Sequence, residues 1–173
     1  MDRTDAPMVA VTDPPTRQDA LELLREDHRL IAGLFDSYAE SQETLAVAEK
    51  SALVARICNA LTVHAAIEEE IFFPAIRETV DAAGALIDIA EVEHASIKRL
   101  SDDLSATTPS LDSLYDAKVA VLGRYFSDHV HQQEDQLFPR IRKTAVELTA
   151  LGEQLALRRS KAIAQLDGPG SQS

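Results

Sequence analysis

Hydrophobic residues recur at helical spacing along most of the chain, and no strand-like alternation of polar and apolar residues persists. This period predicts amphipathic helices rather than strands. Thr16 with Asp19 is a candidate cap for the first helix, and Pro109 marks a break before the fourth. We expect helices over about residues 17–40, 43–80, 83–106, 110–142 and 145–166.

Short connections between four long amphipathic helices are typical of an all-α, up-down-up-down four-helix bundle. The fifth segment carries no histidine, and we expect it to be an additional C-terminal helix on the side of the bundle. The bundle and this helix then form one domain over residues 16–166. The N-terminal tail (1–15) and the C-terminal tail (167–173) are expected to be disordered.

The apolar positions of each helix form one face, which predicts the core. Each of the first four helices also carries one histidine in phase with that face. These histidines are His28, His64, His94 and His129. The expected inward residues around them are Leu21, Leu24, Ile31, Phe35, Val54, Ile57, Leu61, Ile71, Phe72, Ala75, Ile87, Ala90, Ile97, Leu104, Leu114, Leu122, Phe126, Leu137 and Ile141.

Four imidazoles in one core need a common partner, because burying a polar ring without one is costly. A metal centre would supply that partner. Glu68 follows His64 by four residues, so both lie on one helical face. Glu134 follows His129 by five and can still reach inward. Gln133 holds the better-aligned place, but its neutral amide is a poor metal ligand, so we favour Glu134. Imidazole and carboxylate ligands together favour iron over zinc.

An internal echo links the second and fourth helices. The segments HAAIEEEIFFP (64–74) and HVHQQEDQLFP (129–139) each place a histidine ten residues before the proline of an FP pair. This echo indicates equivalent roles for the two helices, with a proline able to bend each helix just beyond the site. His131 lies about 200° from His129 around the helix, so we expect it on the surface.

The charge, cysteine content and apolar runs of the chain exclude several classes of partner and site. The chain has 29 acidic and 17 basic residues and a net charge of −12, which argues against nucleic acid and membrane surfaces as partners. One cysteine, Cys58, and no CxxC motif exclude a disulfide scaffold and a thiolate zinc site. The polar, proline-broken N-terminus does not read as a signal peptide, and no apolar run is long enough for a membrane span. We therefore expect a cytoplasmic protein.

The distributed motif of His28, His64 with Glu68, His94, and His129 with Glu134 resembles the hemerythrin-like (HHE) cation-binding family. The resemblance covers about residues 20–142. It implies two non-haem iron ions, oxo- or hydroxo-bridged, with Glu68 and Glu134 as bridging carboxylates and histidines as terminal ligands. These ligands would leave an iron position open for a small ligand.

The chain departs from the family's oxygen carriers on the third helix. Those proteins have two histidines there, whereas this chain has Ala90 four residues before His94. Glu91, three residues before His94, is the nearest replacement. The expected metal ligands are therefore His28, His64, Glu68, Glu91, His94, His129 and Glu134.

Ferritin-like di-iron proteins are the other class to compare. They place ExxH on two helices and a lone glutamate on each of the other two. Here Glu91 and His94 form one ExxH, but Arg25, Leu61 and Phe126 lie three residues before the other histidines. One histidine on each helix favours the hemerythrin type.

The resemblance implies a protein that binds O2, NO or peroxide in sensing, storage or stress response. A non-enzymatic binder is favoured, because no obvious substrate pocket or acid–base pair stands out. A catalase-like peroxide-degrading enzyme and an iron–sulfur cluster repair or iron-handling protein are alternatives. Repair proteins of this type usually carry a further N-terminal domain with paired cysteines, which this sequence lacks. A metal-free helical interaction module is a third class, and the sequence does not identify a protein partner.

Overall fold

The computed structural model describes residues 18–80 and 83–166. The bundle consists of four rods, two of which contain a π-helical turn. The first rod is α1 (Ala20–Ser41) and the third is α4 (Gly84–Ser105). The second rod runs through α2 (Val47–Ile67), the π-helical turn η1 (Glu68–Phe72) and α3 (Phe73–Thr79). The fourth runs through α5 (Tyr115–Gln132), the π-helical turn η2 (Gln133–Leu137) and α6 (Phe138–Ile141). The last helix is α7 (Leu148–Leu166).

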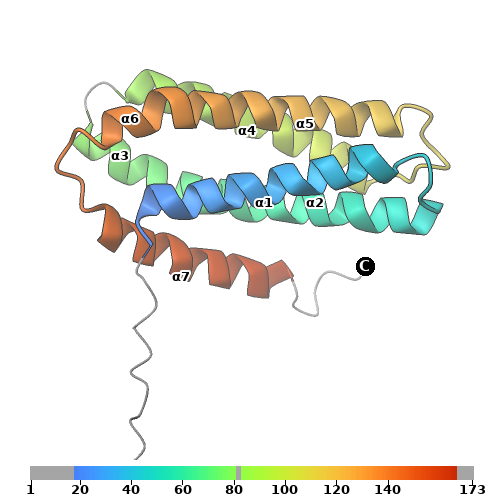
Figure 1. Ribbon diagram of the computed structural model, residues 1–173, viewed down its shortest axis with the longest axis horizontal. Coiled ribbons are helices and arrows are strands. Elements are labelled where there is room, and N and C mark those ends of the chain that lie inside the picture. Colours follow the sequence, from blue (N-terminus) through green and yellow to red (C-terminus); the bar gives the residue numbers. More distant parts are fainter. Residues whose placement is uncertain (1–17, 81–82, 167–173) are drawn as a thin grey trace, which may run out of the picture.

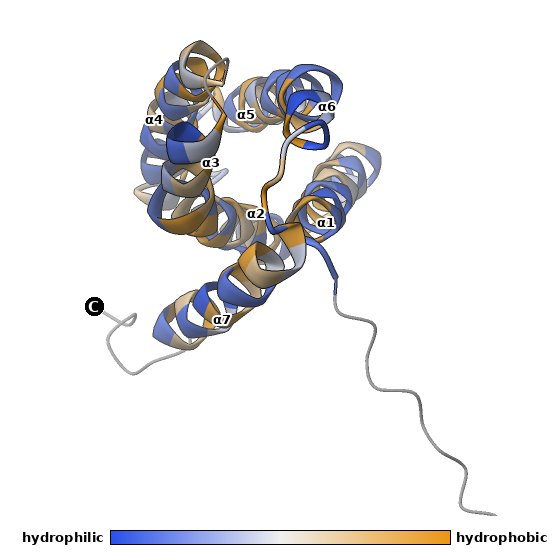
Figure 2. Ribbon diagram, turned by 90° about the vertical axis from the view of Figure 1, so that its left-hand side faces the viewer, coloured by the Kyte–Doolittle hydropathy of each residue, from blue (hydrophilic) through white to orange (hydrophobic). Residues whose placement is uncertain are grey.

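The four rods form a closed ring in which α1 packs on α2, α2 on α4, α4 on α5, and α5 on α1. Figure 1 shows the rods side by side along the long axis of the molecule. Viewed from its end, the bundle carries α7 outside the ring, against α1 and α2 (Figure 2). The predicted all-α bundle with an additional C-terminal helix is therefore confirmed. The predicted tails, 1–15 and 167–173, and Thr16 lie outside the described residues.

Local chemistry explains where the helices begin. Asp19 caps α1, since its carboxylate accepts a hydrogen bond from the Glu22 amide at 2.9 Å. The fourth rod begins at Tyr115, not near residue 110 as predicted, because the Leu114 amide donates to the Asp112 carboxylate at 2.8 Å and holds a turn there. Leu114 is consequently 61% exposed, and the prediction that it is buried is wrong. Tyr115 is buried instead.

Each π-helical turn lies directly before an FP pair. In η1 the Phe73 amide donates to the Glu68 carbonyl, and in η2 the Phe138 amide donates to the Gln133 carbonyl, five residues back in each case. Proline has no N–H and its ring crowds the carbonyl four residues earlier. A wider turn immediately upstream accommodates Pro74 and Pro139 without ending either rod.

Two apolar clusters fill the bundle, and the histidine of every rod lies between them along the sequence. Phe35, Ile71 and Ala75 are only half-buried, and apart from these and Leu114 the predicted inward residues are buried. One cluster includes Leu21, Leu24, Ile67, Phe72, Ile76, Ile87, Ala90, Leu137, Phe138 and Ile141. The other includes Ile31, Val54, Ile57, Leu61, Ile97, Leu104, Val119, Leu122 and Phe126.

The helix α7 fits closely against the start of α1. A Cβ atom added at Gly152 would lie 2.4 Å from the Gln18 carbonyl oxygen, so this approach requires glycine. None of the described helices combines the length and the apolar content needed to cross a lipid bilayer.

Candidate metal centre

Four buried histidines, one from each rod, meet at a single level of the bundle. The ring centroids of His28 and His64 are 5.0 Å apart, and those of His94 and His129 are 4.6 Å apart. The rings of His64 and His129 connect the two pairs at 5.7 Å. Since each histidine replaces an apolar residue on an inward face, the bundle forms a polar layer between its two apolar clusters.

Glu68 is the carboxylate at the centre of this layer, and its side chain is 0% exposed. Its Oε2 atom lies 3.2 Å from His94 Nε2, 3.3 Å from His129 Nε2 and 3.6 Å from His64 Nε2. Glu68 opens the π-helical turn η1, four residues after His64, as the helical phase predicted.

Gln133 occupies the equivalent place on the fourth rod. It opens η2, four residues after His129, and is 0% exposed. Its amide Nε2 donates a hydrogen bond to Glu68 Oε2 at 2.8 Å. Sequence reasoning rejected Gln133 because its amide carries no charge, although the echo of 64–68 in 129–133 pointed to this position.

The two other predicted glutamate ligands lie elsewhere. Glu134 is 30% exposed, and its Oε1 lies 2.7 Å from His28 Nδ1. It therefore contacts the other ring nitrogen of His28 and not Nε2. Glu91 is 49% exposed and pairs with Arg77 at 3.0 Å. Ala90, one residue earlier on α4, takes the buried position. The structure does not bring Glu91 into the cluster, and its role as a ligand stays a prediction.

Three of the histidines have a carboxylate on Nδ1. Glu134 contacts His28, Glu69 contacts His94 at 2.9 Å, and Glu93 contacts His129 at 3.2 Å. A carboxylate that accepts from Nδ1–H fixes the tautomer and turns an unprotonated Nε2 to the other side. Sequence reasoning singled out neither Glu69 nor Glu93. Both lie directly beside Glu68 or His94 in the chain, but each contacts a histidine of another rod, which the spacing does not indicate.

Several polar atoms of the layer have no hydrogen-bond partner among the residues that the structure describes. They are His28 Nε2, His64 Nδ1, His64 Nε2, Glu68 Oε1 and Gln133 Oε1. Buried nitrogen and oxygen atoms normally have a partner, so their convergence fits a bound cation. His28, His64, Glu68 and His129 each offer one ligand atom, and these four atoms lie within 4.8 Å of one another.

The charges of the layer also suit a cation. Burial raises the pKa of Glu68, but the attraction of His64 and the hydrogen bonds from His129 and His94 outweigh it and hold that pKa well below its ordinary value. Burial lowers the pKa of His64 well below its ordinary value and also lowers that of His28. At neutral pH Glu68 is therefore an anionic carboxylate, and His28 and His64 are neutral imidazoles.

The pKa values of His94 and His129 shift in the opposite direction. Burial lowers the pKa of His94, but hydrogen bonds to Glu68 and Glu69 outweigh burial and raise it to about 9. Burial likewise lowers the pKa of His129, and its hydrogen bonds to Glu68 and Glu93 raise it overall. A cation that binds these Nε2 atoms would displace protons.

Three surface cavities of the described part of the chain include a histidine of the layer in their walls, and the third, of about 380 Å³, lies beside Glu69, Glu91 and His94. One of about 400 Å³ lies between α1 and α5 and includes His28 and Glu134 in its wall. Another of about 230 Å³ lies between α2 and α4 and includes His94 and Glu69. His131 lies at the wall of the first cavity and is exposed, as predicted, with its Nδ1 donating to the Ser127 carbonyl at 2.8 Å.

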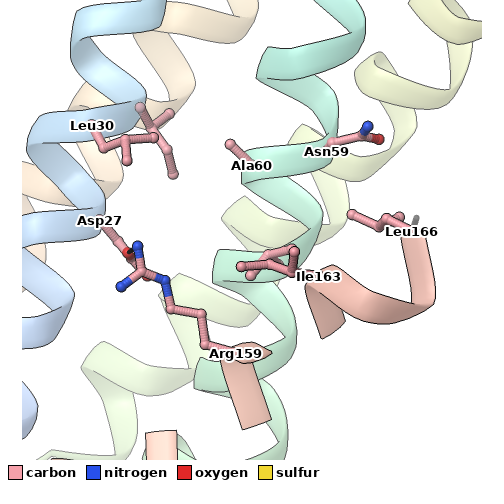
Figure 3. Close-up of a pocket in the computed structure, with 9 residues that line it drawn as sticks. Asp27, Leu30, Asn59, Ala60, Arg159, Ile163 and Leu166 are labelled. Atoms are coloured by element: carbon pink, nitrogen blue, oxygen red, sulfur yellow. Dashed lines mark ion pairs between the residues drawn. The ribbon is translucent and has the colours of Figure 1, made fainter. Parts of the chain in front are cut away.

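The residue before His28 ties α1 to the last helix. Buried Asp27 pairs with Arg159 of α7 at 2.8 Å, at the edge of an apolar cavity of about 230 Å³ (Figure 3). Burial raises the pKa of Asp27 to about 6, although the Arg159 charge acts in the opposite direction. This ion pair therefore lies next to the site in the chain but outside the histidine layer.

The sequence model of one protein family, described as the hemerythrin HHE cation binding domain, matches residues 19–141. A hemerythrin HHE cation binding domain-containing protein from Mycobacterium kansasii, known from a crystal structure, is similar with a TM-score of 0.72 and 25% sequence identity. The similarity covers 88% of this chain and 94% of that chain.

A curated protein from Nostoc sp. (strain PCC 7120), named DNA nickase, is 31% identical to this chain over 137 residues. The matched segment is 77% of this chain but 37% of the Nostoc protein. The chain therefore spans little more than a third of the length of this relative.

Proposed function

The chain belongs to the hemerythrin HHE cation-binding domain family, and we propose that it holds two non-haem iron ions that bind O2, NO or hydrogen peroxide. The observation that carries this proposal is the buried layer of four histidines around Glu68, with nitrogen and oxygen atoms that lack partners within residues 18–80 and 83–166. Imidazole nitrogens with carboxylate oxygens are ligands that iron accepts, and no thiolate joins them. When bound, the iron would supply an open coordination position for the small ligand.

The protein's own residues would hold and orient this centre. His28, His64, His94 and His129 would bind through Nε2, and Glu68 would bridge. Glu69, Glu93 and Glu134 would keep three of the rings turned inward through their Nδ1 contacts. Glu134 would have to leave His28 to become a bridging ligand, and Glu91 would have to leave Arg77. The apolar clusters above and below would exclude water.

We propose a cytoplasmic role in sensing, storage or stress response, with no nucleic-acid or membrane partner. The net charge of −12 supports the exclusion of nucleic acid, because such a surface repels phosphate. The name of the Nostoc relative is not carried over, since the chain matches 37% of that protein. The single cysteine, Cys58, is buried and fits a reducing compartment.

Iron analysis and the optical spectrum of the full chain, loaded anaerobically with Fe²⁺ and then exposed to air, test the proposal. We expect two irons for each chain and the charge-transfer absorption of a bridged ferric pair. His64→Ala should lose most of this iron, because it removes a buried ligand. His131→Ala is the matched control and should keep it, since His131 is exposed. Zinc in place of iron, or equal iron content in His64→Ala, would overturn the proposal.

Oxygen evolution from hydrogen peroxide separates a binder from a catalase-like enzyme. We expect the iron-loaded protein to evolve no more oxygen than the same concentration of free iron. Faster turnover that is lost in His64→Ala would replace the binding role with the enzymatic one.

A further inference from the structure

The last helix, α7, lies beyond the family match at residues 19–141 but contacts the rods that carry the histidine layer. Two consecutive arginines make this connection. The Arg158 guanidinium donates two hydrogen bonds to Glu70, one to each carboxylate oxygen, at 2.7 and 2.6 Å. Arg159 pairs with buried Asp27 at 2.8 Å. The helix is thus bound both to η1 of the second rod and to α1.

Both ion pairs lie next to an expected metal ligand in the chain. Glu70 follows Glu68 by two residues in the π-helical turn η1, and Asp27 directly precedes His28 in α1. Glu68 is fully buried whereas the Glu70 side chain is 52% exposed, so the two point to different sides of the turn. His28 and Glu68 each offer a ligand atom to the same cluster. The two ion pairs therefore hold, from outside the ring, the backbone segments that present these two ligands.

Apolar packing does not by itself fix this part of α7. The first half of the helix buries three residues, whereas Ala162 is the one buried residue of 157–166, all of which the structure describes. An apolar cavity of about 230 Å³ lies between this second half, α1 and α2, with Arg159 and Asp27 at its edge (Figure 3). A guanidinium that bonds both oxygens of one carboxylate fixes its direction as well as its distance. The two ion pairs therefore set how α7 lies against the rods at the level of the histidine layer.

We propose that Arg158 and Arg159 are positioning residues of the metal centre. Through Glu70 and Asp27 they fix the orientation of η1 and α1, and thereby the placement of Glu68 and His28 relative to each other. The inference rests on the proposed metal centre and extends it to a helix outside the family match. Loss of either ion pair should change the affinity for the metal, because both ligands must reach the same pair of cations.

Anaerobic equilibrium dialysis of the metal-free full chain against Fe²⁺ compares Arg158→Gln with the wild-type protein. We expect Arg158→Gln to weaken Fe²⁺ binding about three- to tenfold, less than the loss of a residue that contacts a metal ligand directly. Its free energy of unfolding without metal should stay close to the wild-type value, since a partly exposed ion pair contributes little stability. Lys161→Gln removes an exposed cation from the same helix and is the matched control, with Fe²⁺ binding unchanged.

A double-mutant cycle tests whether Arg158 acts through Glu70. Glu70→Gln should weaken Fe²⁺ binding as much as Arg158→Gln does. The variant with both substitutions should bind Fe²⁺ no more weakly than either single variant, because residues that act as one pair are not additive. Additive losses would overturn the role of the pair.

The second ion pair needs a different variant, because Arg159→Gln alone would leave a buried carboxylate unpaired and could unfold the protein. Asp27→Asn combined with Arg159→Gln removes both charges, and circular dichroism reports the fold. We expect Fe²⁺ binding about three- to tenfold weaker than in the wild-type protein.

Wild-type Fe²⁺ affinity in folded Arg158→Gln or in the folded Asp27→Asn, Arg159→Gln variant would overturn this inference and leave the metal centre intact. So would a loss of affinity in Arg158→Gln that is matched by an equal loss of unfolding free energy, since that result indicates a purely structural role. Absence of any Fe²⁺ binding by the wild-type protein would overturn the proposed function as well.

Discussion

At the scale of single residues, the choice between Gln133 and Glu134 shows what a sequence can and cannot decide. The helical phase pointed to residue 133, four positions after His129, and the structure buries that side chain beside Glu68. The preference for a charged ligand pointed to Glu134, which lies instead against Nδ1 of His28. Helical phase depends only on nearby positions in the chain, so the burial of residue 133 could be predicted from the sequence.

The glutamates that contact Nδ1 of a histidine on another rod could not be predicted from a local sequence pattern. Glu93 lies on α4 and contacts His129 of α5, and Glu69 lies on η1 and contacts His94 of α4. Each contact depends on how two rods are aligned along the bundle. Exposed glutamates are abundant in this chain, so these two could not be distinguished from the rest by their spacing.

Asp27 gives a pH dependence of stability whose direction follows from its pKa. The folded-state pKa is raised from 3.8 to about 6, so the folded protein binds more protons than the unfolded chain between these values. The free energy of unfolding should therefore fall as the pH rises through this window, by about 1–3 kcal/mol from this group. Asp27→Asn should flatten the decline. Urea unfolding of the metal-free protein between pH 4 and pH 7 measures it.

Asp36→Asn is the control for this measurement, because Asp36 is an exposed aspartate on the same helix. It should keep the wild-type pH profile. If the profile of Asp27→Asn ran parallel to that of the wild-type protein, burial of Asp27 would not be the source of the pH dependence.

At the scale of elements, periodicity located the helices well and their ends less well. The apolar period placed the five predicted segments on the four rods and α7, because burial of one face determines each helix. The fourth rod starts later than predicted, since Asp112 stabilises a turn that the position of Pro109 did not indicate. The π-helical turns could not be foreseen, because a bend and a wide turn are both compatible with an FP pair.

The contact between α7 and the entry to α1 should depend on the absence of a side chain at Gly152. An added Cβ would lie 2.4 Å from the Gln18 carbonyl oxygen and 3.0 Å from the Ala20 amide nitrogen. These are backbone atoms, so relief requires a shift of the whole helix. We expect Gly152→Ala to lower the free energy of unfolding by about 1–3 kcal/mol, as overpacking does.

Gly33→Ala is the matched control for chemical denaturation of Gly152→Ala. Gly33 lies within α1, and an added Cβ there meets nothing within 4 Å. Alanine favours a helix over glycine by about 1 kcal/mol, so this variant should be more stable than the wild-type protein. Equal effects of the two substitutions would show that close packing of α7 is unimportant.

At the scale of the whole molecule, a polar layer divides the core in two. The sequence predicted that the four histidines lie together in the core, because every rod has a histidine between apolar residues of the same phase, but it did not predict the division into two clusters. It could not predict which side of the ring α7 covers, since its amphipathic face would fit any neighbouring pair of rods. The Asp27–Arg159 ion pair and the Gly152 contact hold α7 to α1, and the Arg158–Glu70 ion pair holds it to the second rod.

Removal of the metal should destabilise the entire bundle, because the layer joins all four rods. A ligand that binds only the folded state stabilises it by about 2.7 kcal/mol at a concentration of 100 times its dissociation constant. We expect a chelator to lower the thermal unfolding midpoint of the iron-loaded wild-type protein and of His131→Ala. In His64→Ala the chelator should have little effect. A wild-type midpoint that does not respond to chelation would contradict a metal that holds the rods together.

The wide turns at Glu68 and Gln133 also bear on how such a chain can change during evolution. A π-helical turn contains one residue more than an α-turn, so it behaves as a single-residue insertion whose flanks keep their rotational register. A deletion there would leave both apolar clusters aligned but would place Pro74 or Pro139 within a regular α-helix. A proline in a helix interior lowers the free energy of unfolding by about 3 kcal/mol. The proline thus disfavours loss of the inserted residue, because the deletion would destabilise the helix at the proline and not at the histidine layer.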